Sequence, residues 1–168
     1  DHLYGYRLRC TQLHSVWRLM SILAYIVRHG STDISPKPEW GAQVPLNAFG
    51  RAQAVDAAEF LKRQATKPDF VVSSDLARAE ETGQICAAVL GIKCMRPLSD
   101  LRALNKDEDQ AEFEKRNLHG FTAVLAAAKV RGKIPLIAVH RSNTAWVAKQ
   151  FAGVKQHVDY RQASLIWE

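Results

Sequence analysis

Two uninterrupted apolar runs constrain the fold of this chain more than any other feature of its sequence. Residues 22–27 read Ile-Leu-Ala-Tyr-Ile-Val, and residues 134–139 read Ile-Pro-Leu-Ile-Ala-Val. Neither run alternates with polar residues, which is the pattern of strands that are buried on both faces. Because such strands occur in parallel sheets that helices cover on both sides, the two runs predict an α/β protein.

Weaker strand patterns and helical patterns alternate along the rest of the chain. We expect further strands at residues 69–73, 92–96 and 163–167, the last of them as an edge strand. Helices are expected over residues 48–64, 76–90 and 107–130, and from just after Ser142 or Asn143 to before Gly153. This alternation predicts a three-layer sandwich with a mostly parallel central sheet, helices on both faces and right-handed crossovers.

Local signals mark several helix ends. Asn47 is the expected N-cap of the first helix. Asp75 or Ser74 is expected to cap the second helix, which Gly91 should end. His119–Gly120 predicts a break in the third helix.

The length of 168 residues favours one domain. Residues 1–19 show no clear period, so we expect an N-terminal extension there, followed by a compact domain over 20–168. The stretch 17–27 is apolar, but Arg18 interrupts it and no small-residue cleavage site follows, which favours a strand over a signal peptide. No apolar run reaches the length of about 18 residues that would span a membrane.

The cysteines and the net charge indicate the compartment and the kind of partner. Cys10, Cys86 and Cys94 are far apart and odd in number, so we expect reduced thiols in a cytoplasmic protein and no metal site. The net charge of +6 favours anionic partners. Because basic residues recur singly and aromatic residues make up 8% of the chain, small anions are favoured over nucleic acid.

Residues that bind anions follow three of the predicted strands. The first apolar run ends in Arg28-His29-Gly30, and the second leads directly into His140. The helix after the strand at 69–73 carries Arg78 in its first turn. Because the carboxyl ends of parallel strands meet at one edge of the sheet, we expect these groups to converge on a phosphate.

This set of side chains suits phosphoryl transfer. A neutral imidazole can attack phosphorus and form a covalent phosphohistidine. Guanidinium groups match phosphate oxygens in pairs and stabilise the charge of the transition state. Gly30 lets the backbone approach the phosphate closely. The arginines supply the charge that a metal provides in nucleotide enzymes, so we expect no metal and no other cofactor.

Four segments match the motifs of one known family. They read VRHGST at 27–32, PLNAFGRAQA at 45–54, VSSDLARA at 72–79 followed by Thr82, and VH at 139–140. Through these motifs the chain resembles the histidine phosphatase superfamily, also called phosphoglycerate-mutase-like, from about Ser21 to its end.

The resemblance implies a role for each matching residue. His29 would be the phosphorylated nucleophile, and Arg28 and Arg78 would bind the phosphoryl group. His140 would complete the catalytic pocket, and Thr32 would line its mouth.

The chain departs from the family pattern at four places. Ser31 replaces a glutamate, residues 33–35 lack the usual asparagine, and Val139 replaces the glycine before the second histidine. Ala103 stands where many members carry the glutamate that protonates the leaving group. Loss of such an acid typically lowers the rate by about 10²–10⁴-fold, so another carboxyl group would have to protonate the leaving group in its place. The candidates are Asp100, Asp107, Glu108 and Asp33.

The resemblance implies a metal-independent phosphatase that hydrolyses a phosphomonoester or a phosphohistidine through a phosphohistidine intermediate. Its partner would be a small phosphorylated substrate or a phosphoprotein. Two alternatives stay open: a non-catalytic phosphate-binding or interaction module with a degenerate pocket, and a phosphotransferase of the phosphoglycerate-mutase type. The short chain favours hydrolysis, because the mutases carry longer insertions that enclose the substrate.

Overall fold

The structure is a computed structural model that describes residues 23–33, 43–150 and 164–167. The expected N-terminal extension over residues 1–19 lies outside the described residues. So does most of the loop that follows the first strand.

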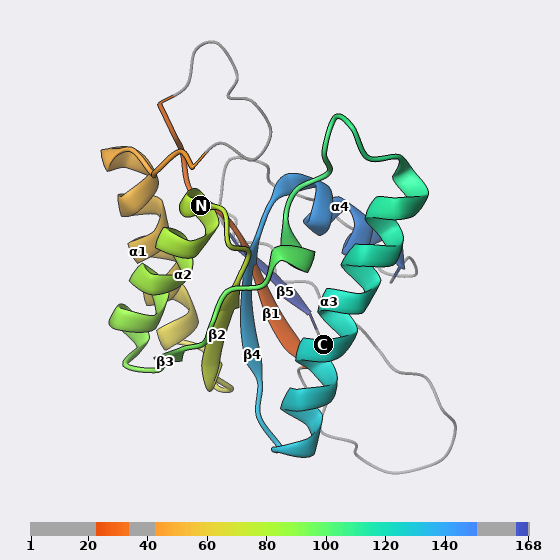
Figure 1. Cartoon of the computed structure of the whole chain (residues 1–168). Coiled ribbons are helices and arrows are strands. Elements are labelled where there is room, and N and C mark those ends of the chain that lie inside the picture. Colours follow the sequence, from red (N-terminus) through yellow and green to blue (C-terminus); the bar gives the residue numbers. More distant parts are fainter. Residues whose placement is uncertain (1–22, 34–42, 151–163, 168) are drawn as a thin grey trace.

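The described strands form one five-stranded sheet in the order β3-β2-β4-β1-β5 (Figure 1). The strands are β1 (Ala24–Arg28), β2 (Phe70–Ser73), β3 (Lys93–Cys94), β4 (Pro135–Val139) and β5 (Ser164–Trp167). The first four run parallel to their neighbours, and β5 lies antiparallel to β1 at the edge. The mostly parallel sheet and the edge position of its last strand confirm the predicted architecture.

Helices cover both faces of the sheet, which confirms the three-layer sandwich. The helices α1 (Ala48–Lys62) and α2 (Ala77–Leu90) lie on one side, and α3 (Gln110–Val130) and α4 (Arg141–Gln150) on the other (Figure 1). A short 3₁₀ helix, η1 (Ser99–Leu101), connects β3 to the segment that leads into α3.

The core consists of two apolar clusters, one on each side of the sheet. Ile137 and Val139 of β4 belong to the cluster that contains Phe113 and Phe121 of α3. Their neighbours in the strand, Leu136 and Ala138, belong to the other cluster, with residues of α1 and α2. Because alternate residues of a strand face opposite sides, β4 must be apolar throughout, which explains its uninterrupted run.

Two of the predicted helix ends are confirmed. The Asn47 side chain accepts a hydrogen bond of 2.7 Å from the backbone N–H of Gly50 and so caps α1. Gly91 ends α2 with a φ of 67°, in the left-handed region that glycine adopts at little cost.

The predicted cap of α2 is wrong. Leu76 is the N-cap residue, and it makes no side-chain capping hydrogen bond. The Asp75 carboxylate instead binds the Arg102 guanidinium at 2.7 and 2.8 Å. The Ser74 hydroxyl lies 2.9 Å from a ring nitrogen of His140. Both side chains therefore contact other parts of the chain, and although Ser74 also accepts from the backbone N–H of Leu76, neither is the N-cap of α2.

The predicted break at His119–Gly120 is also wrong, because α3 is continuous from Gln110 to Val130. A Cβ atom added to Gly120 would lie 2.9 Å from the Cβ of Asp100. The glycine thus allows α3 to pack closely on η1. The helix begins after Asp109, which forms a reciprocal capping box with Glu112.

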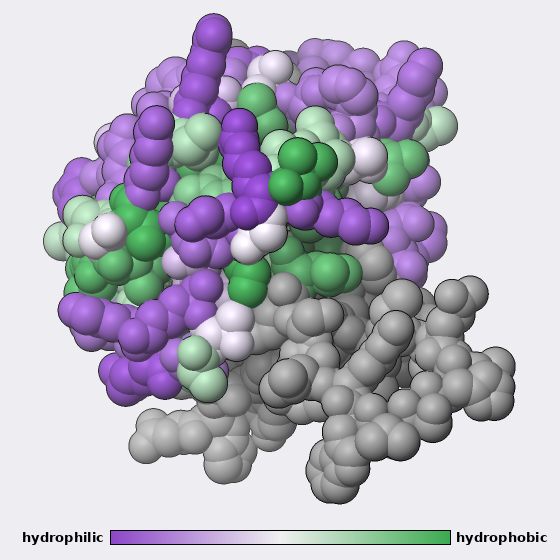
Figure 2. Space-filling model, turned by 90° about the horizontal axis from the view of Figure 1, so that it is seen from below, coloured by the Kyte–Doolittle hydropathy of each residue, from purple (hydrophilic) through white to green (hydrophobic). Residues whose placement is uncertain are grey.

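The surface of the described part is mixed in polarity. Figure 2 shows hydrophilic side chains interspersed with smaller hydrophobic patches on the face seen from below. No helix among the described residues is both long enough and apolar enough to cross a bilayer.

Candidate active site

The two central parallel strands bring His29 and His140 together. The backbone N–H of His29 donates to the carbonyl of Val139 at 2.9 Å, which extends the β1–β4 pairing past the end of β1. His140 follows Val139 directly. The centroids of the two imidazole rings lie 5.2 Å apart, with an angle of 60° between the ring planes.

The backbone sets the protonation of the His29 ring. Its Nδ1 lies 2.8 Å from the carbonyl oxygen of Gly30. Since a carbonyl oxygen only accepts, Nδ1 carries the proton and Nε2 carries the lone pair. Burial lowers the pKa of His29 to about 4, and the charges of Arg78 and Arg28 add to this effect, whereas the hydrogen bond to Gly30 opposes it. The ring is therefore neutral at pH 7.

Two guanidinium groups lie within electrostatic range of both histidines. Arg28 ends β1, and Arg78 lies in the first turn of α2. After the dominant effect of burial, their charges further lower the pKa values of His29 and His140. Burial also lowers the pKa of Arg78 itself. Partly buried cations beside a neutral imidazole make a site that attracts an anion.

His140 is enclosed, with 2% of its surface exposed. Burial, the first of several causes, lowers its pKa well below the ordinary value. Its Nε2 lies 2.9 Å from the Ser74 Oγ, and its backbone N–H donates to the Asn143 side chain at 3.1 Å. Sequence reasoning missed Ser74 as a neighbour of this ring.

Thr82 joins the end of β1 to α2. Its Oγ1 accepts a hydrogen bond from the backbone N–H of Gly30 at 3.2 Å. The same hydroxyl donates to the carbonyl of Arg78 at 2.7 Å. The segment that carries His29 is thereby tied to the helical turn that carries Arg78.

Close backbone packing places this segment against α1. A Cβ atom added to Gly30 would lie 2.3 Å from the carbonyl oxygen of Gly50. A Cβ added to Gly50 would lie 2.1 Å from the carbonyl oxygen of Ser31. The backbone N–H of Ser31 also donates to the Gln53 side chain at 2.8 Å. Both glycines are thus required because two backbone segments approach each other closely, not because either residue has a positive φ.

Glu81 connects α2 with the start of α1. One carboxylate oxygen accepts from the backbone N–H of Leu46 at 2.8 Å, and the other from the Arg51 Nε at 2.6 Å. The sequence contains no signal for this contact, since a glutamate on a helix is usually solvated.

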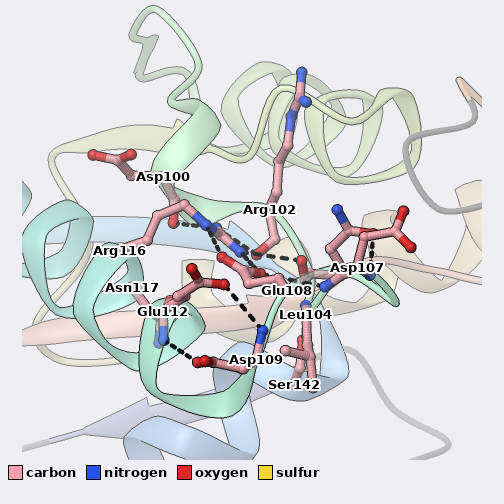
Figure 3. Close-up of polar contacts among 12 residues, drawn as sticks. Asp100, Arg102, Leu104, Asp107, Glu108, Asp109, Glu112, Arg116, Asn117 and Ser142 are labelled. Carbon is pink, nitrogen blue, oxygen red and sulfur yellow. Dashed lines mark hydrogen bonds and ion pairs between the residues drawn. The ribbon is translucent and has the colours of Figure 1, made fainter.

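Two of the four candidate acids lie beside α3 (Figure 3). Glu108 is bound by Arg116 at 2.7 and 2.8 Å, and this hydrogen bonding lowers the pKa of Glu108. Asp100 lies 2.6 Å from His119 Nδ1. Both carboxylates line a surface hollow whose lining includes neither His29 nor His140. An ionised, arginine-bound carboxylate such as Glu108 is poorly suited to donate a proton.

The other two candidates lie in loops. Asp33, which follows the half-buried Thr32 in the described part of the first loop, accepts from the Asn47 side-chain amide at 2.8 Å. Asp107 is exposed, and its backbone N–H donates to the Asn105 side chain at 3.2 Å.

The segment around Ala103 is held from α3. Arg116 donates to the carbonyl oxygens of Asp100, Arg102 and Ala103 at 2.8, 3.1 and 3.3 Å. The position that carries a glutamate in many family members therefore has a fixed backbone and a methyl side chain. Among the described residues, no three His, Cys, Asp or Glu side chains gather closely enough to hold a metal ion.

Comparisons with known proteins agree with these motifs. The sequence model of the histidine phosphatase superfamily (branch 1) matches residues 24–106, which include His29 and Arg78 but not His140. A 2,3-bisphosphoglycerate-dependent phosphoglycerate mutase of Chelativorans sp. (strain BNC1) is 29% identical over 112 residues, 60% of this chain and 54% of the mutase. The chain spans about half the length, or less, of the curated relatives that it matches.

Solved structures share the fold at low identity. The phosphoglycerate mutase from Bacillus anthracis str. Sterne superposes with a TM-score of 0.70 at 18% identity, covering 83% of this chain and 84% of the mutase. A mycobacterial glucosyl-3-phosphoglycerate phosphatase superposes with a TM-score of 0.61 at 21% identity, covering 76% and 77%. With its motifs, its family match and its fold in agreement, the chain belongs to the histidine phosphatase superfamily.

Proposed function

We propose that this chain is a metal-independent phosphatase that hydrolyses a phosphomonoester or a phosphohistidine through a covalent phosphohistidine at His29. The observation that carries the proposal is the hydrogen bond from His29 Nδ1 to the Gly30 carbonyl. It leaves the lone pair on Nε2, in a ring that burial keeps neutral, beside His140 and within range of Arg28 and Arg78.

The reaction follows from these groups in two steps. Nε2 of His29 attacks the phosphorus atom while the bond between phosphorus and the leaving group breaks. Arg28 and Arg78 stabilise the negative charge on the transferring oxygens. Water then attacks the phosphohistidine, phosphate leaves, and the neutral His29 ring is regenerated. Gly30 O holds the Nδ1 proton throughout, so the ring keeps one tautomer.

The Ala103 side chain cannot donate a proton to the leaving group. Glu108 is the least suitable of the four candidate acids, because Arg116 keeps it ionised. The proposal therefore favours leaving groups that are weak bases or take a proton from water. Aryl phosphates and phosphohistidine meet this condition, whereas alkyl phosphates require protonation of a basic alkoxide. Asp100, Asp107 and Asp33 stay candidates for that protonation.

Two other functions have a specific observation in their favour. The similarity to phosphoglycerate mutases favours a phosphotransferase, in which a substrate rather than water takes the phosphoryl group from His29. The methyl group at Ala103 favours a phosphate receptor without turnover.

The test is phosphate release from an aryl phosphate and from a phosphohistidine peptide, in EDTA, by the wild type and by His29→Ala. We expect the variant to lose at least about 10³-fold in kcat/KM, because it removes the nucleophile. Val130→Ala is the control, since Val130 is 87% exposed at the end of α3 and the loss of its side chain should leave the rate unchanged. An acid-labile phosphoryl group on His29 should be detected by mass spectrometry after rapid quenching.

Three results would argue against hydrolysis through His29. Equal turnover by the wild type and His29→Ala would assign the activity elsewhere. Transfer of the phosphoryl group between two positions of one substrate, without release of phosphate, would indicate the mutase reaction. Binding of vanadate with no turnover of either substrate would indicate the receptor.

A further inference from the structure

The two ring nitrogens of His140 lie in different surroundings. Nε2 is 2.9 Å from the Ser74 Oγ, and both side chains are buried. Nδ1 is equally buried but has no hydrogen-bond partner in the described part of the chain. A buried polar atom of this kind usually has a partner, so a ligand is expected to supply one for Nδ1.

The hydrogen bonds around Ser74 indicate which nitrogen carries the proton. The Ser74 Oγ already accepts from the backbone N–H of Leu76 at 3.3 Å. If Ser74 donates its own hydrogen to Nε2 of His140, every hydrogen in this chain of contacts has an acceptor. The Nδ1 atom then carries the ring proton and is available to donate it to a ligand.

The opposite tautomer does not fit an anion. A proton on Nε2 would leave a lone pair on the buried Nδ1, and a phosphoryl oxygen would repel it. A doubly protonated ring would add a charge beside Arg28 and Arg78 in a buried site, which burial and both guanidinium groups oppose.

We propose that Ser74 is a positioning residue that selects the tautomer of His140, so that Nδ1–H of this neutral ring donates to an oxygen of the phosphoryl group bound at His29. The proposal rests on the proposed function only in assuming that the site holds a phosphoryl group. It explains why the Ser74 hydroxyl contacts the His140 ring rather than capping α2.

The neighbouring serine offers a matched control. Ser73 is also fully buried, but its hydroxyl has no hydrogen-bond partner among the described residues. Both Ser73→Ala and Ser74→Ala remove one buried hydroxyl at the end of β2. Only Ser74→Ala removes the contact with His140.

The decisive measurement is the nitrogen NMR spectrum of the imidazole groups in protein labelled with ¹⁵N-histidine. We expect the wild-type His140 to carry its proton on Nδ1. In Ser74→Ala the tautomer on Nε2 should become populated, Ser74→Thr should restore the wild-type pattern, and Ser73→Ala should leave it unchanged. Inorganic phosphate should shift the Nδ1–H signal in the wild type and bind about 10-fold more weakly to Ser74→Ala.

The wild-type spectrum alone can overturn the proposal. A His140 ring protonated on Nε2 would contradict it, even if Ser74→Ala failed to fold. An Nδ1 tautomer that persists in a folded Ser74→Ala protein would contradict it as well. Both results would leave phosphate release by the wild type, and so the proposed function, unaffected. A wild type that binds inorganic phosphate but turns over neither substrate would contradict the proposed hydrolysis. The tautomer of His140 in that protein would still test the role of Ser74.

Discussion

At the level of single residues, the proposed role of His29 depends on the neutral state of its ring. Its environment stabilises that state mainly by burial, with Arg78 and Arg28 adding to the effect. Only the neutral ring has a lone pair on Nε2, so the proposed attack on phosphorus requires this form.

This environment predicts the acid limb of the pH profile. Protonation of His29 should lower kcat/KM for an aryl phosphate only as the pH falls toward about 4, where the ring of the free enzyme gains its second proton. Arg28→Ala removes a nearby positive charge, so it should raise the pKa of His29 and move the limb to higher pH. The profile is measured between pH 3.5 and 8 with Lys115→Ala as a control, since Lys115 is exposed on α3. A limb centred near 6.5 in the wild type would show that burial does not control His29.

At the level of elements, Arg116 of α3 organises the segment between η1 and α3. It holds three carbonyl groups of residues 100–103 and the carboxylate of Glu108 (Figure 3). The side chains of Arg116 and Glu108 are 22% and 14% exposed, so the pair is only partly screened by water.

Replacing Arg116 tests this arrangement. Arg116→Met should lower the free energy of unfolding by about 2–3 kcal/mol, because it removes the charged donor that Glu108 and three carbonyl groups share. Lys115→Met, the adjacent exposed position, should change it by less than about 0.5 kcal/mol. Urea denaturation measures both values, and similar stability of the two variants would mean that water replaces the arginine without cost.

At the level of the whole molecule, the buried neutral histidines couple stability to pH. The pKa of His29 is about 4 in the folded chain against 6.5 for an ordinary histidine, and that of His140 is lowered too. Below pH 6.5 the unfolded chain therefore binds more protons than the folded chain. The stabilisation linked to His29 is complete above about pH 6.5 and is lost as the pH falls toward about 4.

Chemical denaturation at a series of pH values measures this coupling. The free energy of unfolding should fall by on the order of 3 kcal/mol between pH 7 and pH 4 through His29 alone. His29→Ala should reduce the dependence on pH, whereas Val130→Ala should retain it because Val130 is exposed and carries no titratable group. An unchanged slope in His29→Ala would mean that the pKa of this ring is the same in the folded and unfolded chains.

The architecture and the meeting of the two histidines follow from the sequence for a simple reason. An apolar run without alternation identifies a strand buried on both faces, and parallel strands end at the same edge of the sheet. His29 and His140 each follow such a run, so their proximity depends only on strand direction and pairing. The caps Asn47 and Gly91 were likewise predictable, because capping depends on residues close in sequence.

The contacts that complete the site were decided by the tertiary structure. Ser74 and Asp75 suggested a helix cap, yet they bind His140 and Arg102, which lie far along the chain. Glu108 suggested an available acid, yet Arg116 engages it. Side-chain hydrogen bonds require positions fixed to within a few tenths of an ångström. A periodic pattern specifies which face of an element is buried, but the packing of helices on the sheet determines which side chains meet there.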